Sequence, residues 1–157
     1  MNVLVLPIDT VSINHIFFLD SKKNILMDGV FTKITYINEW FTMNGMYINL
    51  PIDVQNIDYN HVSGQKHTIY FSVSKHADII YLVENLERII LEKYNPSEYK
   101  PAVYSIANSL RMGYFKIFKE SGMIHQKTGF ALKISGIWEN SKGYGLSYKI
   151  MDSFSVI

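Results

Sequence analysis

Hydrophobic and polar residues alternate most regularly near the C-terminal end of the chain, from Phe130 to Met151 (FALKISGIWENSKGYGLSYKIM). A period of two places successive side chains on opposite faces of a strand, so this stretch predicts two strands joined by a polar turn at residues 139–143. We expect one face of the hairpin to be apolar, with Trp138 on it beside Leu132 and Ile134. The opposite, open face carries Lys133, Ser135, Ser147 and Lys149.

A helical period replaces the alternation in only one long segment, from about Lys75 to Tyr94. Ser74 is expected to cap the start of this helix, and Asn95-Pro96 ends it. Apolar residues at helical spacing predict a stripe that faces the core. The members of this stripe are Ile79, Leu82, Val83, Leu86, Ile89, Ile90 and either Lys93 or Tyr94.

Shorter runs with a period of two predict the other strands. Their ranges are Val3–Pro7, His15–Asp20, Ile25–Ile37, Trp40–Ile52, His67–Val73, Leu110–Phe118 and, at the end of the chain, Ser153–Ile157. Residues 21–24 are expected to form a turn and residues 53–66 a loop, while YSIANSL, within residues 96–107, could be a short helix. The Asn44-Gly45 pair leaves two alternatives open, a two-residue hairpin turn or a glycine bulge inside one strand.

Many short strands with a single amphipathic helix predict a mainly β protein, an antiparallel barrel whose open end is plugged by the helix at about 75–94. The 157 residues, of which 48% are hydrophobic, are expected to form one domain over residues 1–157. No apolar run approaches the length of a membrane span, and the start, MNVLVLPIDT, has no basic region of a signal peptide. The chain has no cysteine, which excludes disulfides and fits an intracellular location.

The net charge is only +1, but it is distributed unevenly. Residues 1–100 carry eight basic and eleven acidic residues, whereas residues 101–157 carry seven basic and three acidic residues. Lysine far outnumbers arginine, and isoleucine, asparagine and tyrosine are abundant, which is typical of the AT-rich codons of a low-GC genome. A net charge of +1 argues against a strongly electrostatic nucleic-acid binder, and the C-terminal third is the more basic part of the chain.

The layout of three strands, a helix and two more strands over about residues 25–150 is that of an OB-fold. Together with LKISGIWEN and YGLSYKI in the closing hairpin, it resembles the OB-fold single-stranded DNA-binding proteins of phages and large DNA viruses. The resemblance implies an OB-like barrel that binds single-stranded DNA. Proteins of that family often end in an acidic tail that recruits replication partners, and this chain instead ends DSFSVI, so recruitment through such a tail is not expected.

Aromatic residues interleaved with basic residues carry the binding hypothesis, because bases stack on exposed rings and cations contact the phosphates. The predicted nucleic-acid-binding residues are Lys33, Trp40, Tyr47, Tyr70, Arg111, Tyr114, Lys116, Lys133 and Lys149. The simpler explanation of any one of them is structural. A β-rich domain needs aromatic residues in its core, and lysines on edge strands prevent aggregation.

No catalytic or metal-binding signature accompanies these residues. The histidines are His15, His61, His67, His76 and His125, and no pair has the spacing of a metal site. No glycine-rich phosphate loop and no nucleophile elbow occurs. The sequence therefore predicts neither an enzyme nor a metal or other cofactor.

Two hypotheses follow. The first is a non-enzymatic protein that binds single-stranded DNA in the replication or recombination of viral or low-GC DNA, in the host cytoplasm or nucleus if viral. Its partners would be single-stranded DNA, a second copy of the chain and other replication or virion proteins, with no membrane. The alternative is a structural or assembly protein, such as a virion component with a β-sandwich, that acts through protein–protein interfaces.

Overall fold

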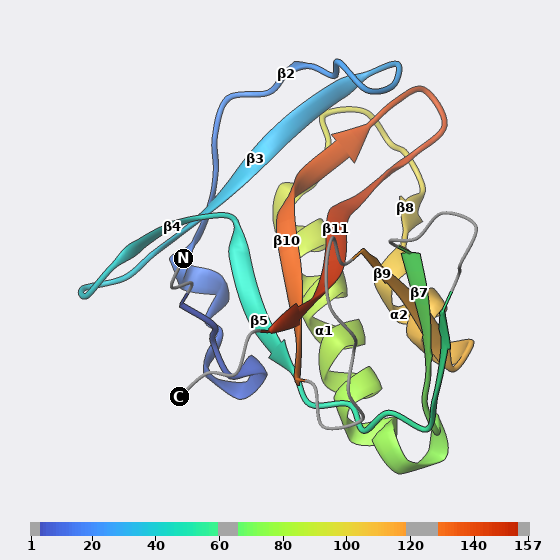
Figure 1. The fold of residues 1–157 in the computed structure, drawn as a ribbon. Coiled ribbons are helices and arrows are strands. Elements are labelled where there is room, and N and C mark those ends of the chain that lie inside the picture. The colour runs from blue at the N-terminus through green and yellow to red at the C-terminus, as the bar shows by residue number, and fades with distance from the viewer. Residues whose placement is uncertain (1–3, 60–65, 119–128, 154–157) are drawn as a thin grey trace.

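A computed structural model describes residues 4–59, 66–118 and 129–153 of the chain (Figure 1). It is mainly β, as the alternating runs predicted, with two α-helices in this part of the chain. The strands are β1 (Ile16–Phe18), β2 (Lys22–Lys23), β3 (Val30–Ile37), β4 (Thr42–Asn44), β5 (Met46–Leu50), β6 (Asn56–Tyr59), β7 (Lys66–Tyr70), β8 (Ala102–Val103), β9 (Tyr114–Phe118), β10 (Gly129–Glu139) and β11 (Tyr144–Ser153). The helices are α1 (Ala77–Tyr94) and α2 (Ser105–Arg111), and short 3-10 turns are η1 (Ile8–Thr10), η2 (Ile13–His15) and η3 (Ser74–His76).

Strand β10 is the centre of the larger sheet. It pairs with β11 along its whole length, which confirms the predicted closing hairpin. On its other side it is shared by two strands. Its first half, from Phe130 to Ile134, pairs with β5, and its second half, from Gly136 to Glu139, pairs with β3. Strands β1, β2 and β4 extend the sheet from β3, and β8 pairs in parallel with β11.

Gly45 decides between the two alternatives for Asn44-Gly45. Its φ of 81° lies in the left-handed region that favours glycine. The chain bends there without reversing, so that β4 pairs with β3 before the bend and β5 pairs with β10 after it. The Gly45 amide donates to the Ile34 carbonyl at 2.8 Å, which fixes the bend against β3. Gly45 is therefore an irregularity within one extended segment and not part of a two-residue hairpin turn.

Strands β6, β7 and β9 form a separate antiparallel sheet. No pairing among the described strands joins the two sheets into a closed barrel. The predicted barrel needed β7 and β9 to pair with the long central strands, but they pair with each other, and β11 takes the remaining edge of β10. The coarser prediction of a mainly β fold is confirmed, and barrel closure is not found.

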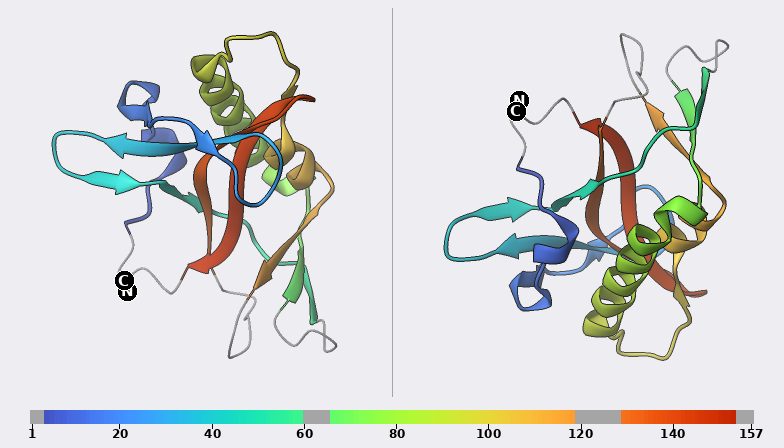
Figure 2. Two further views of the ribbon diagram at one scale, coloured as in Figure 1. Left: turned by 90° about the horizontal axis from the view of Figure 1, so that it is seen from above. Right: turned by 90° about the horizontal axis from the view of Figure 1, so that it is seen from below.

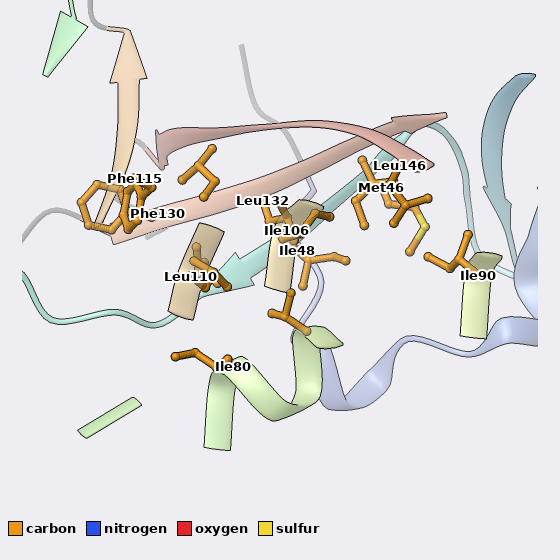
Figure 3. Packing of buried hydrophobic residues seen from close by; sticks show 14 of the residues in the cluster. Met46, Ile48, Ile80, Ile90, Ile106, Leu110, Phe115, Phe130, Leu132 and Leu146 are labelled. Carbon is orange, nitrogen blue, oxygen red and sulfur yellow. The ribbon is translucent and has the colours of Figure 1, made fainter. Parts of the chain in front are cut away.

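Both helices cover the inner face of the larger sheet, and Figure 1 shows α1 behind β10 and β11. Figure 2 shows the same arrangement from above and below, with α1 crossing under the strands. Figure 3 shows Ile80 and Ile90 of α1, with Ile106 and Leu110 of α2, packed against the sheet residues Ile48, Phe130, Leu132 and Leu146. All eight side chains are buried, so burial of apolar surface in this layer is the main driving force of the fold.

The predicted helix is confirmed over Ala77–Tyr94, but its start differs from the prediction. Ser74 belongs to the 3-10 turn η3, and His76 precedes the first residue of α1 without a side-chain capping hydrogen bond. The buried positions of α1 are Ile80, Val83, Glu87, Ile90 and Leu91. A carboxylate therefore stands in the middle of the core-facing stripe, which a pattern of apolar residues could not predict.

Two other boundaries are corrected by strand pairing. Lys22 and Lys23, predicted as a turn, form β2 against β3, and residues 24–29 make the turn instead. The predicted loop at 53–66 contains the edge strand β6, whose partner is β7. YSIANSL does include a helix, α2. The predicted last strand, Ser153–Ile157, falls almost wholly outside the described residues.

None of the helices in the described part of the chain combines the length and the hydropathy needed to span a bilayer.

Candidate functional site

A β-bulge at Ser135 determines which side chains face outward from the sheet. Ile134 pairs with Tyr148 and Gly136 pairs with Ser147, so Ser135 has no partner on β11 and is one extra residue in β10. One extra residue reverses the alternation beyond it. Ile137 is therefore buried with Ile134, and Trp138 points to the outer face. The expectation that Trp138 shares the core face of Leu132 is wrong for this reason.

Phe31 and Trp138 are neighbours on the outer face, since they are Cα partners across β3 and β10. Each ring leans over a glycine of the next strand. A Cβ at Gly136 would lie 2.6 Å from Cζ of Phe31, and a Cβ at Gly145 would lie 2.8 Å from Cζ2 of Trp138. Because neither glycine has a side chain, both rings can lie along the sheet, and both stay partly exposed. The two rings therefore form an aromatic surface close to the sheet, across β3, β10 and β11.

A groove of about 990 Å³ stands over this surface. Phe31, Trp138, Ser135 and Ser147 line its sheet side, and the segment from Phe18 to Met27, which includes β2, forms its opposite wall. The wall is fixed to the sheet by the β2–β3 pairing and by the 2.6 Å hydrogen bond between the hydroxyls of Ser21 and Thr32. Figure 1 shows this loop at the end of the molecule where the β10–β11 turn lies.

Three lysines line the same groove, Lys22 and Lys23 from β2 and Lys33 from β3, and all are exposed. Asp20 is the one acidic residue among the described residues that line it. None of the three lysines makes an ion pair with a carboxylate of the described residues. The groove therefore has an excess of positive charge beside an aromatic surface.

Four basic residues elsewhere in the fold differ in this respect. Arg111 is paired with Glu84, Arg88 with Glu92 at 3.1 Å, and Lys100 with Glu139 at 3.6 Å. Lys93 donates from Nζ to the carbonyls of Ile13 and Ile16, at 2.9 and 2.6 Å. These cations are neutralised or used in the structure, so the unpaired lysines of the groove are better placed to attract an anion.

The outer face continues beyond the groove along β5, β10 and β11. Tyr47, Lys133 and Lys149 lie side by side there, as Cα partners in neighbouring strands. The Lys133 ammonium lies 5.4 Å from the centroid of the Tyr47 ring, a cation–π contact. Four of the nine predicted binding residues, namely Lys33, Tyr47, Lys133 and Lys149, are thus brought onto one face.

Tyr114 and Lys116 lie on β9 of the second sheet, beside a second groove of about 600 Å³ between β9 and β11. Lys149 also lines this groove, which makes it the residue shared with the outer face. Tyr70 is the Cα partner of Tyr114 on β7, with ring centroids 6.0 Å apart. It does not line either groove.

Trp40 and Arg111 also line neither groove. Trp40 is 84% exposed in the turn between β3 and β4, and Figure 1 shows this hairpin extending away from the rest of the sheet. Arg111 ends α2 and is paired with Glu84 of α1. Phe31, Trp138, Lys22 and Lys23 are the groove residues absent from the predicted set. Glycines at 136 and 145, within otherwise regular strands, were the one sequence signal for a ring lying flat on the sheet.

Among the described residues no group of three or more His, Asp or Glu side chains is arranged to hold a metal ion.

One carboxylate is buried between the two helices. The carboxylate of Glu87 accepts hydrogen bonds from the amides of Ile106 and Ala107, both at 3.0 Å, at the start of α2. Burial raises its pKa above the ordinary value, against the lowering effect of these two bonds. Glu87 lines neither groove, so its role is to hold α2 against α1.

Comparison of the chain with protein-family models, with curated proteins and with solved structures finds no match. Function is therefore inferred from the geometry and the charge of the grooves.

Proposed function

We propose that this protein binds single-stranded DNA without catalysis, in the groove above Phe31 and Trp138. The observation that carries the proposal is the pair of rings lying over Gly136 and Gly145 beside three lysines that no described carboxylate neutralises. Stacking of one base on an aromatic ring contributes about 1–3 kcal/mol, and lysines along the backbone supply the salt-dependent part of the affinity.

A single strand fits this surface better than a duplex. The bases of a duplex are stacked on one another and cannot present a face to Phe31 or Trp138, whereas an unpaired strand can turn its bases onto the rings. The serines on the floor of the groove, Ser135 and Ser147, are small enough to leave the rings accessible and can donate to bases or phosphates. The preference for single strands follows from this geometry.

An OB-like barrel and a role in replication or recombination of viral or low-GC DNA belong to the same proposal. The mainly antiparallel larger sheet with one long helix across its inner face supports the OB-like part, although the described strands do not close a barrel. The role in replication or recombination rests on the proposed ligand, single-stranded DNA. The net charge of +1 predicts moderate affinity, because only the local charge of the grooves attracts the strand.

The test is fluorescence anisotropy of a labelled oligothymidine titrated with the protein, at about 0.05 and 0.2 M salt, with a duplex of the same length as control. We expect binding that prefers the single strand and weakens with salt. The Lys33→Ser variant should bind about fivefold more weakly at about 0.1 M salt, the counterion contribution of one phosphate contact. The matched variant Lys75→Ser changes an exposed lysine that lines neither groove and should bind like the wild type. Equal affinity for duplex and single strand, or no binding at low salt, would contradict the proposal.

A second candidate function is favoured by one observation, the exposed apolar side chains of the loop that forms the groove wall. Ile25 is 95% and Leu26 91% exposed at the tip of this loop. Large apolar side chains at such exposure are typical of protein–protein contacts, which would fit a structural or assembly protein. Mass measurements over a range of protein concentrations test this candidate. Oligomers that dissociate in the Leu26→Ser variant, with no response to oligothymidine, would support it over DNA binding.

A further inference from the structure

The groove between β9 and β11 has a composition that the fold does not explain. Tyr114 and Lys116 line it from β9, and Lys149 lines it from β11, with Met112 and Met151 on its apolar part. None of the described residues that line it is acidic. Neither lysine forms an ion pair with a carboxylate of the described residues. An aromatic ring and two such lysines in one groove repeat the chemistry of the first groove.

The two grooves are adjacent on β11. Ser147 lines the first groove and Lys149 the second, and residues two apart on a strand point to the same face. Gly145 lies opposite Trp138, and Lys149 follows it four residues later on β11. The distance between the two positions is about 14 Å along the strand, at about 3.4 Å per residue. An extended strand that leaves the rings can therefore reach the second groove within a few nucleotides.

A pair of like charges lies at the edge of the second groove. Lys133 and Lys149 are Cα partners across β10 and β11, and like charges directly opposite each other destabilise a sheet. No described carboxylate compensates them by an ion pair. A phosphate bound over the pair would remove the repulsion, so the arrangement that is unfavourable in the free protein becomes favourable with an anionic backbone above it.

We infer that the β9–β11 groove is a second contact site for the same single strand. The backbone leaves the Phe31/Trp138 groove, crosses Lys133 and Lys149, and places its following bases beside Tyr114 with Lys116 on a phosphate. The inference rests on the proposed DNA binding and adds the path and the length of the bound strand. A protein partner in this groove is less favoured, because lysines without acidic neighbours match a polyanion better than a mixed protein surface.

Oligothymidines of about 4, 8, 12 and 16 nucleotides, spanning the site sizes of small single-strand-binding domains, test the inference. The affinity for the wild type should rise steeply when the oligonucleotide becomes long enough to enter the second groove. For Lys116→Ser we expect unchanged binding of the shortest ligand and about fivefold weaker binding of the longest at about 0.1 M salt. Its salt dependence, as a log–log slope, should decrease by about 0.7 for the long ligand.

The outcomes separate the two proposals. Short oligothymidines could bind while the affinity for longer ones rises only because they offer more overlapping binding positions. If Lys116→Ser then also changes nothing, the second site is wrong and the first stands. If Lys116→Ser weakens short and long ligands equally, the strand does not follow this path, and the second site is again wrong. If no oligothymidine binds at low salt, the proposed function itself fails. Lys75→Ser and Tyr114→Leu complete the set, the first expected to be neutral and the second to weaken only long ligands.

Discussion

Removing the carboxylate of Glu87 should destabilise the fold strongly, although no apolar pattern marks this residue. Its side chain is 1% exposed, and it accepts hydrogen bonds from the amides of Ile106 and Ala107, each at 3.0 Å. In Glu87→Ala both amides lose their acceptor inside the core, at a cost of about 1–3 kcal/mol each. Removal of a buried polar carboxyl group returns part of this, so we expect a loss of about 2–4 kcal/mol.

Urea unfolding followed by circular dichroism measures this change in the free energy of unfolding. The matched control is Glu92→Ala, which removes an exposed carboxylate on the same helix from its pair with Arg88. That change should cost no more than about 0.5 kcal/mol. The variant Glu87→Gln keeps one acceptor oxygen and should fall between the two. Equal stability of Glu87→Ala and Glu92→Ala would refute the assignment of Glu87 as the group that holds the start of α2.

The pH dependence gives an independent check on the same residue. Burial raises the pKa of Glu87 in the folded state above its ordinary value of 4.5, so the folded protein binds a proton more readily than the unfolded chain. The contribution of Glu87 to stability is therefore largest below 4.5 and decreases as the pH rises through the folded-state pKa. The stability difference between wild type and Glu87→Gln should grow as the pH is lowered. A difference that shrinks over that range would contradict the direction of the shift.

Three other changes test the outer face and the core. Trp138→Ala should weaken oligothymidine binding about 5- to 150-fold, the equivalent of one lost stacking contact, and Trp40→Ala should leave the binding unchanged. Anisotropy titrations compare the two variants, and equal effects would contradict the assigned groove. Gly136→Ala places a Cβ against the Thr32 carbonyl and the Phe31 ring and should cost about 1–3 kcal/mol in thermal unfolding, whereas Ser135→Ala beside it should stay within about 0.5 kcal/mol. Lys93→Met removes the donor to the carbonyls of Ile13 and Ile16 and should cost about 1–3 kcal/mol in urea unfolding, with Lys75→Met as the neutral control.

The sequence by itself determined the elements that depend on neighbouring residues. Strict alternation over Phe130–Met151 predicted the closing hairpin, and helical spacing predicted α1, because each pattern places its apolar residues on one face whatever the rest of the chain does. It also placed Lys133 and Lys149 on the open face of the hairpin, where the structure has them. Lys133 precedes the bulge on β10, and Lys149 lies on β11, which has no extra residue, so the simple alternation still holds for both.

The tertiary structure decided what depends on contacts between distant segments. The bulge at Ser135 turned Trp138 outward, and the pairing of β10 with both β3 and β5 set which residues became its neighbours. Register is a property of two strands, and a shift of one residue exchanges the faces of everything beyond it. In the same way, the apolar stripe of α1 could not reveal Glu87, because its acceptors became necessary only when the amides of α2 were buried against it. The local pattern fixes the elements, and the contacts between them decide which side chains meet in a groove.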